Sequence, residues 1–354
     1  MSKKKETVAL GLSGGVDSSV AAFLLQQQGY NVIAYYMRNW STDLGKFKCP
    51  WKEDRDSALR VANHLNIPFY TLNFEKEYKE KVVDYLFDGY QKGITPNPDI
   101  MCNKEIKFKI FLEKVLKLGA DKIATGHYSQ VQEDQDGFHL LKGKDQNKDQ
   151  SYFLYALNQK QLSKTLFPVG GYTKPQIRKI AKDAELPSAN KPDSQGICFI
   201  GEVNITELLK TKIKPQKGDI ITTEGEKIGE HEGVWYYTIG QRKGIKIGGG
   251  VPYFVVEKDL KNNKLIVAHG SWSEELFSNS CEITNMHWIN KEPIKYPYKC
   301  QIKTRYRQVD QDCQITKQGN KYLVKFKEKQ RAITSGQSTV LYHKEECLGG
   351  GIIS

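Results

Sequence analysis

Long hydrophobic runs are absent from this sequence. No apolar stretch among its 354 residues approaches the roughly 18 residues that a membrane span requires. The N-terminal residues are polar and basic, and the apolar stretch that follows them is too short for the core of a signal peptide. We therefore expect a soluble protein in the cytoplasm that has no membrane partner.

Paired cysteines are absent as well. The seven cysteines are odd in number and include no C-x-x-C pair, so the sequence indicates neither a disulfide framework nor a zinc module. We expect reduced thiols and no metal centre built from protein ligands alone. Most of these cysteines should be packing residues, which leaves one or two for chemistry.

Acidic residues are too few to balance the basic ones. The chain has 53 Lys and Arg against 41 Asp and Glu, which gives a formal net charge of +12. A surplus of this size favours a polyanion such as nucleic acid, because Lys and Arg near phosphates release counterions on binding. Surplus lysine that simply keeps a surface solvated explains the charge equally well, so charge alone does not choose between the two.

The order of the expected elements divides the chain into three parts. Apolar strands at 7–12, 31–36 and 69–73 alternate with helical patterns, which predicts an α/β fold with a doubly wound parallel sheet. After about residue 200, short alternating segments predict a small β-rich central domain and then a C-terminal β-barrel. The expected domains cover 1–204, 205–275 and 276–354. Further expected elements are helices at 18–28, 54–65, 75–90 and 104–118 and a barrel strand at 301–307.

A glycine pair lies between the first expected strand and the first expected helix. The segment Leu12–Ser19 reads LSGGVDSS and matches neither G-x-x-x-x-G-K-S/T nor G-x-G-x-x-G. Its glycines allow a close approach to phosphate, its serines can donate hydrogen bonds, and the helix that follows points N–H groups at an anion. Asp17 suits a magnesium ion better than a phosphate. An ordinary capped turn is the alternative, but the segment resembles the S-G-G-x-D-S signature of the N-type ATP pyrophosphatases.

Two further segments are expected at the same edge of the sheet, because they follow expected strands. The backbone of Met37 can bond an adenine edge while its thioether packs on the ring, although a plain core role fits equally well. Gly126 allows close approach of a nucleotide, and His127 and Tyr128 can face an acceptor. A lone histidine is more often structural, so the role of His127 depends on its neighbours.

Two cysteines have surroundings that favour chemistry. Cys102 comes directly before the helix expected from Lys104, so the helix N-terminus and nearby lysines would favour its thiolate. Asp99 can donate or accept a proton there, or it can simply cap the helix beside a half-buried cysteine. Cys198 lies in the segment DSQGICF, and taken alone it is typical of a buried cysteine at the end of a strand.

Together these segments resemble the bacterial tRNA-specific 2-thiouridylase (MnmA) family. The similarity runs from end to end and includes residues 148–152, 304–307 and 335–337. It implies a PP-loop fold of the adenine nucleotide alpha hydrolase type and ATP-dependent replacement of the C2 oxygen of uridine 34 by sulfur. The implied cofactors are ATP and Mg²⁺, and the implied partners are tRNA with a wobble uridine and a cysteine desulfurase or sulfur-carrier protein.

The resemblance also implies roles for particular residues. Cys198 would receive a persulfide. Cys102 would then attack on the Cys198 side to release the product and leave a Cys102–Cys198 disulfide. Asp99 would be a third catalytic residue. The implied ATP contacts, with Asp17 also the candidate magnesium ligand, are Gly11, Leu12, Ser13, Gly14, Gly15, Val16, Asp17, Ser18, Met37 and Gly126. The implied tRNA contacts are Asn97, Pro98, Asp99, His127, Lys148, Asp149, Gln150, Arg305, Tyr306 and Gln337.

Two other functions compete with this interpretation. An ATP pyrophosphatase that amidates a small-molecule carbonyl would need neither cysteine and would gain nothing from the positive charge. A non-catalytic basic RNA-binding protein would not need an intact phosphate loop. Exchange of pyrophosphate into ATP that depends on tRNA separates all three.

Overall fold

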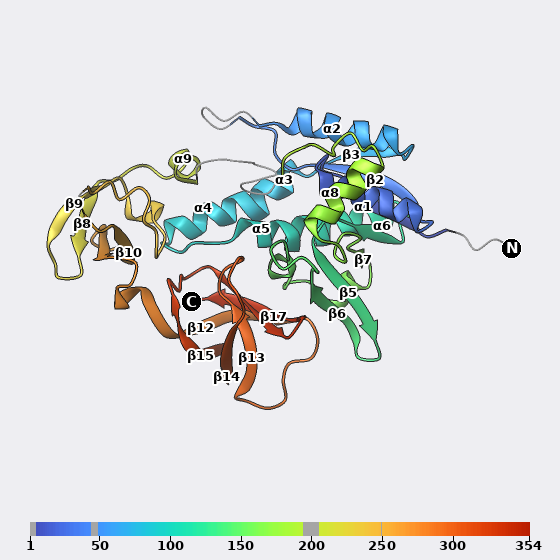
Figure 1. Cartoon of the computed structure of the whole chain (residues 1–354). Helices are drawn as coiled ribbons and strands as arrows, with labels where there is room; N and C mark the ends of the chain where they lie inside the picture. The colour runs from blue at the N-terminus through green and yellow to red at the C-terminus, as the bar shows by residue number, and fades with distance from the viewer. Residues whose placement is uncertain (1–4, 44–48, 194–204, 249) are drawn as a thin grey trace.

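The computed structural model describes residues 5–43, 49–193, 205–248 and 250–354. Figure 1 shows an α/β body, a β-rich part at the opposite end of the molecule and a barrel below and between them. Within the described ranges, no helix combines the length and the apolar character that crossing a membrane demands.

A parallel sheet forms the centre of the α/β body. Its strands pair in the order β3-β2-β1-β4-β7, and each pair is parallel. The chain moves outward from β1 in one direction and then returns to its other side, so the order reverses at β1, as the predicted doubly wound class requires. The strands are β1 (Thr7–Gly11), β2 (Asn31–Arg38), β3 (Phe69–Asn73), β4 (Lys122–Ala124) and β7 (Thr165–Leu166).

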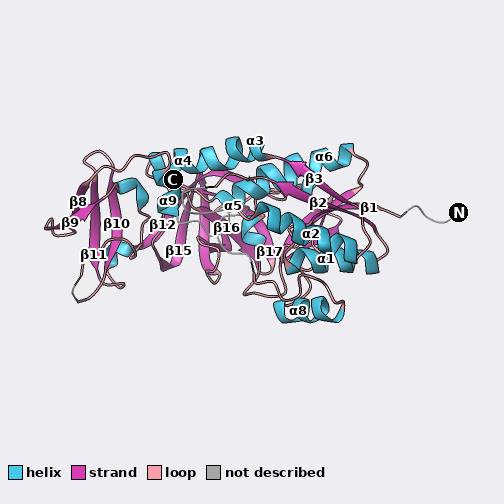
Figure 2. Cartoon of the chain, turned by 90° about the horizontal axis from the view of Figure 1, so that it is seen from above, coloured by secondary structure: helices cyan, strands magenta, loops and turns pink. Residues whose placement is uncertain are grey.

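Helices cover both faces of this sheet, as Figure 2 shows. Val8 and Leu10 pack toward α1 (Val16–Gln27), α2 (Trp51–His64) and α8 (Lys174–Asp183). Ala9, between them in sequence, packs into the other core, because side chains alternate along a strand. The helices of that second face are α3 (Glu75–Tyr78) and α4 (Asp84–Gln91), joined by a π-helical segment (Lys79–Val83), and α5 (Pro98–Met101) and α6 (Leu112–Lys117), joined by a second one (Cys102–Phe111).

The helix expected from Lys104 begins earlier, so this prediction was wrong. The side-chain oxygen of Asn97 accepts hydrogen bonds from the backbone N–H groups of Asp99 and Ile100 at 3.1 and 3.3 Å. Pro98 fills the first helical position, where a missing N–H costs nothing. Cys102 therefore lies in the second turn of the helix and not just before it, and Asn97 is the cap instead of Asp99.

The C-terminal part is a closed six-stranded antiparallel barrel, which confirms the predicted barrel. The strands pair in the order β12-β15-β14-β13-β16-β17, and β17 returns to β12. The expected strand 301–307 ends at Lys303, and residues 304–307 form a turn. The strands are β12 (Phe277–Trp288), β13 (Tyr298–Lys303), β14 (Gln311–Gln318), β15 (Lys321–Arg331), β16 (Ser338–His343) and β17 (Glu346–Ile353).

A hairpin from the α/β body joins the barrel. Its strands, β5 (Ser129–Asp134) and β6 (Gly137–Lys142), follow β4, and β6 pairs with β17 at Cys347 and Glu346. The central part carries a separate four-stranded sheet with the order β10-β11-β8-β9, which confirms the predicted β-rich region. Its elements are α9 (Ile205–Lys210), β8 (Gly218–Thr222), β9 (Lys227–His231), β10 (Tyr253–Asp259) and β11 (Lys264–His269). A short helix, α7 (Gln159–Leu162), precedes β7.

Candidate active site

The phosphate loop between β1 and α1 is held in shape by its own hydrogen bonds. The hydroxyl oxygen of Ser18 accepts from the backbone N–H of Ser13 at 3.2 Å and lies 3.1 Å from the Ser13 hydroxyl. Gly14 has a φ of +79°, and a Cβ there would lie 2.6 Å from the carbonyl oxygen of Asp54. Only glycine satisfies both conditions, so Gly14 and the serine hydrogen bonds together define the shape of the loop.

The ends of the neighbouring strands close around this loop. A Cβ on Gly126, just after β4, would lie 2.7 Å from the backbone nitrogen of Ser18 in the first turn of α1. A Cβ on Gly11 would lie 3.0 Å from the terminal methyl of the buried Met37, at the end of β2. The structure therefore brings together the segments from which the ATP contacts were predicted, at the sheet edge where the strand order reverses.

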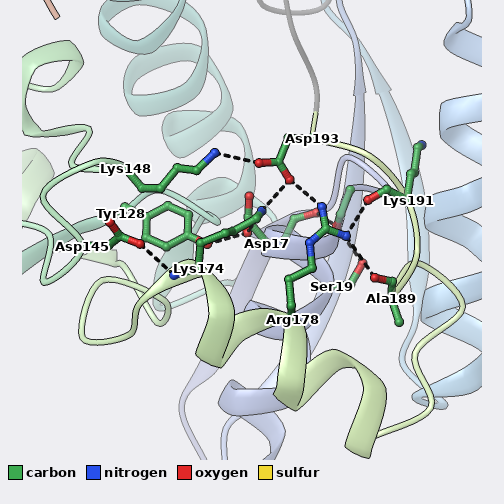
Figure 3. Close-up of polar contacts among 12 residues, drawn as sticks. Asp17, Ser19, Tyr128, Asp145, Lys148, Lys174, Arg178, Ala189, Lys191 and Asp193 are labelled. Carbon is green, nitrogen blue, oxygen red and sulfur yellow. Dashed lines mark hydrogen bonds and ion pairs between the residues drawn. The ribbon is translucent and has the colours of Figure 1, made fainter. Parts of the chain in front are cut away.

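Asp17 is the centre of a polar cluster beside the loop (Figure 3). One of its carboxylate oxygens accepts from the Tyr128 hydroxyl at 2.7 Å and from the Lys174 ammonium at 2.7 Å. Lys174 also lies 2.8 Å from a carboxylate oxygen of Asp193. Burial, together with the neighbouring Asp17, raises the pKa of Tyr128, so its hydroxyl keeps its proton and remains a donor.

Asp193 accepts from a second and a third cation. Lys148 donates to one of its oxygens at 2.7 Å, and Arg178 donates to the other at 2.7 Å. Partial burial opposes ionisation of Asp193, but hydrogen bonds from Lys148 and Lys174 outweigh it and hold the pKa of the carboxyl well below its usual range. The carboxylate is therefore ionised at every physiological pH.

The first predicted cysteine is enclosed by protein. Cys102 is fully buried, and the next residue, Asn103, donates from its side chain to the carbonyl of Phe153 at 3.2 Å. Asp99, one turn earlier, is half-buried. The predicted catalytic Cys198 lies outside the described residues, as does the pairing of the two cysteines.

Family models match nearly all of the chain. A model described as a tRNA methyl transferase HUP domain matches residues 6–202, and one described as a tRNA methyl transferase PRC-barrel domain matches residues 206–269. A third, described as an aminomethyltransferase beta-barrel domain, matches residues 278–353.

Curated relatives decide which family this is. A protein named tRNA-specific 2-thiouridylase MnmA from Shouchella clausii is 50% identical over 100% of this chain and 98% of its own length. Proteins of the same name from Streptococcus sanguinis and Oceanobacillus iheyensis are 50% and 51% identical, over 99% and 100% of this chain and 95% and 96% of their own lengths. The chain belongs to the tRNA-specific 2-thiouridylase family. The family predicted from the sequence is thereby confirmed.

Solved structures resemble this thiouridylase family member more distantly. A crystal structure of a 4-thiouridine synthetase–RNA complex with bound ATP aligns with 56% of this chain and 46% of that chain, at 16% identity and a TM-score of 0.34. This likeness is too weak to support a function.

The segment 148–150, from which the thiouridylase resemblance implied tRNA contacts, packs against the phosphate-loop cluster. Gln150 accepts from the backbone N–H of Tyr128 at 3.0 Å, and its own N–H donates to the Tyr128 carbonyl at 2.8 Å. Asp149 is buried, and its carboxylate accepts from the N–H groups of Gly143 and Ser151 at 3.0 and 3.1 Å. The two side chains therefore support this segment from inside.

Two turns of the barrel reach the α/β body. The Tyr306 ring lies 4.4 Å from that of Phe153, and its hydroxyl donates to the Lys148 carbonyl at 3.4 Å. Arg305 is exposed and donates to the carbonyl of Arg331. In the second turn, Gln337 donates to the Thr95 carbonyl at 2.7 Å, two residues before Asn97.

His127 is buried within the α/β body. Its Nδ1 lies 2.7 Å from the Thr125 hydroxyl and its Nε2 lies 3.5 Å from Lys107, which belongs to the helix that carries Cys102. Burial, and next the Lys107 charge, lower its pKa well below the ordinary value, so the ring is neutral. The ring links the helix of Cys102 to the strand end at Gly126.

Sequence reasoning missed Lys174 and Arg178, although one local signal was present. Thr173 and Gln176 form a capping box that marks the start of α8. A lysine in the first turn of a helix opposes the helix dipole, which indicates that Lys174 serves a partner outside its own helix.

Proposed function

We propose that this chain uses ATP to replace the C2 oxygen of the wobble uridine of tRNA with sulfur, forming 2-thiouridine, AMP and pyrophosphate. The observation that carries the proposal is a phosphate loop that is held in shape by its own hydrogen bonds and is linked, through Gly126 and His127, to the helix of Cys102. This arrangement occurs in a chain 50% identical to curated thiouridylases over its full length. That membership supports thiolation of tRNA in place of the two competing functions.

ATP fits the loop by its chemistry. Exposed Ser13 and the backbone N–H groups of the glycine pair and of the first turn of α1 are the donors that a phosphate needs. Asp17 fits a magnesium ion that phosphate oxygens help to coordinate, because its carboxylate is a hard oxygen ligand beside the loop and Mg²⁺ is commonly held by one or two carboxylates together with substrate phosphates. When bound there, the ion would neutralise charge on the phosphates.

Activation comes before sulfur transfer because a carbonyl oxygen is a poor leaving group. The C2 oxygen of uridine attacks the α-phosphorus of ATP, an oxygen–phosphorus bond forms, and pyrophosphate leaves. The N-terminus of α1 stabilises the negative charge of this step. The uridine must leave its stack to reach the loop, and an RNA loop permits this at low cost.

Sulfur then arrives as a persulfide on Cys198, supplied by a cysteine desulfurase or a sulfur-carrier protein. The terminal sulfur bonds to C2 and AMP leaves with the original oxygen. The Cys102 thiolate attacks the Cys198 sulfur, the persulfide bond breaks toward the base, and 2-thiouridine is released. In the other order, Cys102 first frees sulfide, which then attacks C2. Both orders end in a Cys102–Cys198 disulfide that an external thiol must reduce.

The exposed and half-buried members of the predicted tRNA set are proposed to hold the tRNA, whereas the buried Asp149 and His127 act from inside the fold. Asn97, Pro98 and Asp99 face the target base, with Asp99 available for proton transfer. Lys148 and Arg305 suit phosphates, and Tyr306 suits stacking on a base. We retain the division at residues 204 and 275 as the proposed domain boundaries.

Release of pyrophosphate tests this function directly. The chain is incubated with radiolabelled ATP, with and without unmodified tRNA that carries a wobble uridine. We expect AMP and pyrophosphate to form only when the tRNA is present. Pyrophosphate released at the same rate without tRNA, or with tRNA whose wobble base is cytidine, would contradict the proposal.

A further inference from the structure

Three cations converge on the carboxylate of Asp193, beside the phosphate loop (Figure 3). Lys148, Lys174 and Arg178 donate to its two oxygens at distances of 2.7 to 2.8 Å. Lys174 also pairs with Asp17, so these ion pairs join three cations to two carboxylates, Asp17 and Asp193. A single carboxylate does not need three cations, whereas a polyphosphate carries several charges and many acceptor oxygens.

The guanidinium of Arg178 and the backbone of Lys174 are held in place independently of Asp193. Arg178 also donates to the carbonyls of Ala189 and Lys191 at 3.0 and 2.7 Å, which fixes the plane of its guanidinium. The backbone N–H of Lys174 donates to Asp145 at 2.8 Å and anchors the first turn of α8.

The same helix is packed rigidly against the helix of the phosphate loop. Ile177 and Ala181 of α8 are buried in one core with Val16 and Val20 of α1. Two positive side chains of α8 are therefore set at a fixed position beside the start of α1, where phosphates are expected.

We propose that Lys174 and Arg178 bind the pyrophosphate part of ATP, and that the Asp193 carboxylate occupies their place while no phosphate is present. The inference rests on the proposed function, in which ATP is a substrate. Guanidinium and ammonium groups are the side chains best suited to phosphate oxygens. A carboxylate resembles a phosphate group in its negative charge and in the geometry of its acceptor oxygens. Asp193 therefore competes with the ligand.

This competition gives effects of opposite sign. Lys174→Gln and Arg178→Gln each remove a charge-assisted contact and should weaken pyrophosphate and ATP binding roughly ten- to hundredfold. Asp193→Asn removes the internal competitor and should tighten both. AMP lacks the β and γ phosphates, so its affinity should stay the same in all three variants.

The full chain is titrated with inorganic pyrophosphate, ATP and AMP by isothermal titration calorimetry at one magnesium concentration. Lys179→Gln and Asp183→Asn are matched controls, because these exposed residues pair with each other at 2.8 Å on the same helix. Both controls should leave all three affinities unchanged. Lys174→Arg and Arg178→Lys keep the charge and should retain most of the pyrophosphate affinity. If a glutamine variant fails to fold, these variants still allow the site to be tested.

Two results would overturn the inference. One is pyrophosphate affinity that is unchanged or weaker in Asp193→Asn. The other is an equal loss of AMP and pyrophosphate affinity in the Lys174 and Arg178 variants, which would indicate a structural role. Wild-type chain that binds ATP but leaves tRNA unmodified would instead refute the proposed function, while the titrations would still decide the anion site.

Discussion

The parallel sheet and the C-terminal barrel contribute to the candidate site in different ways. The sheet supplies strand ends and first helical turns: the phosphate loop follows β1 and Gly126 follows β4. The barrel reaches the same region through the turns at Tyr306 and Gln337, which contact loops of the α/β body. The phosphate loop and Gly126 thus lie at the ends of sheet strands, whereas the barrel contacts the segments next to them. Substitutions on the sheet should abolish a step, whereas those on the barrel should reduce its rate.

The largest effect is expected at the phosphate loop. Asp17→Asn and Ser13→Ala should lower pyrophosphate release by roughly 100-fold or more, because each removes a proposed contact to the nucleotide or its magnesium ion, while tRNA binding stays nearly normal. Asp56→Asn, an exposed carboxylate on α2, is the matched control. Normal pyrophosphate release by both loop variants would show that the nucleotide does not bind at this edge of the sheet.

The two thiols provide the next test. A desulfurase should load labelled sulfur on Cys198 in wild type and in Cys102→Ser, because loading needs only the accepting thiolate. Cys102→Ser should then fail to turn over, and wild type after one turnover without reductant should contain a Cys102–Cys198 disulfide. Such a bond brings the two Cα atoms within about 7 Å.

Peptide mass spectrometry, with and without tRNA, locates the label and the disulfide, with Cys49→Ser as the control. Label on Cys102 in the Cys198→Ser variant, or no disulfide after turnover, would refute these roles and leave the overall reaction standing.

A smaller effect is expected where the barrel touches the sheet. Gln337→Ala loses the hydrogen bond to Thr95 at 2.7 Å, which steadies the approach to Asn97. Since one hydrogen bond contributes about 1 kcal/mol, kcat/KM for tRNA thiolation should fall roughly fivefold while ATP affinity is unchanged. Exposed Gln314→Ala on β14 is the control. A complete loss of activity in Gln337→Ala would show that the barrel does more than position a loop.

Burial of His127 makes stability depend on pH. As the pH falls below about 6.5, the unfolded chain binds a proton at this residue, whereas the folded chain, with its lowered pKa, does not. Stability is therefore lost toward acid, by up to about 1.4 kcal/mol per pH unit relative to His127→Gln. Urea unfolding of both proteins at pH 7.5 and 5.5 measures this difference. If the free energy of unfolding changes equally in both proteins between the two pH values, the folded chain also binds a proton at His127 and the prediction is wrong.

The smallest effect is expected at the proposed tRNA contacts, which come from both regions. Lys148→Ala and Arg305→Ala should each weaken tRNA binding and reduce the slope of log affinity against log salt by roughly one. Filter binding between low and high salt gives the slope. An unchanged slope in both variants would mean that the net charge of +12 reflects general surface solvation.

Local patterns predicted the parts of the site that are local in sequence. The phosphate loop, Met37 and Gly126 were predicted as a group because each lies at or just after the end of an expected parallel strand, and the structure brings them to one edge of the sheet. The helix start at Pro98 was misplaced, since the Asn97 cap and the proline that mark it were assigned to a loop. Contacts between distant segments gave no such signal: the pairing of β6 with β17 and the meeting of Lys174 with Asp17 arise from tertiary structure.

Mass spectrometry of the tRNA shows directly whether this chain replaces the C2 oxygen of the wobble uridine with sulfur. The chain is incubated with ATP, a sulfide source and tRNA that carries an unmodified wobble uridine, and the nucleosides are then separated and weighed. We expect 2-thiouridine at position 34 when ATP is present and unmodified uridine when ATP is omitted. Unmodified uridine at that position while ATP is consumed, or sulfur on a different nucleoside, would contradict this expectation.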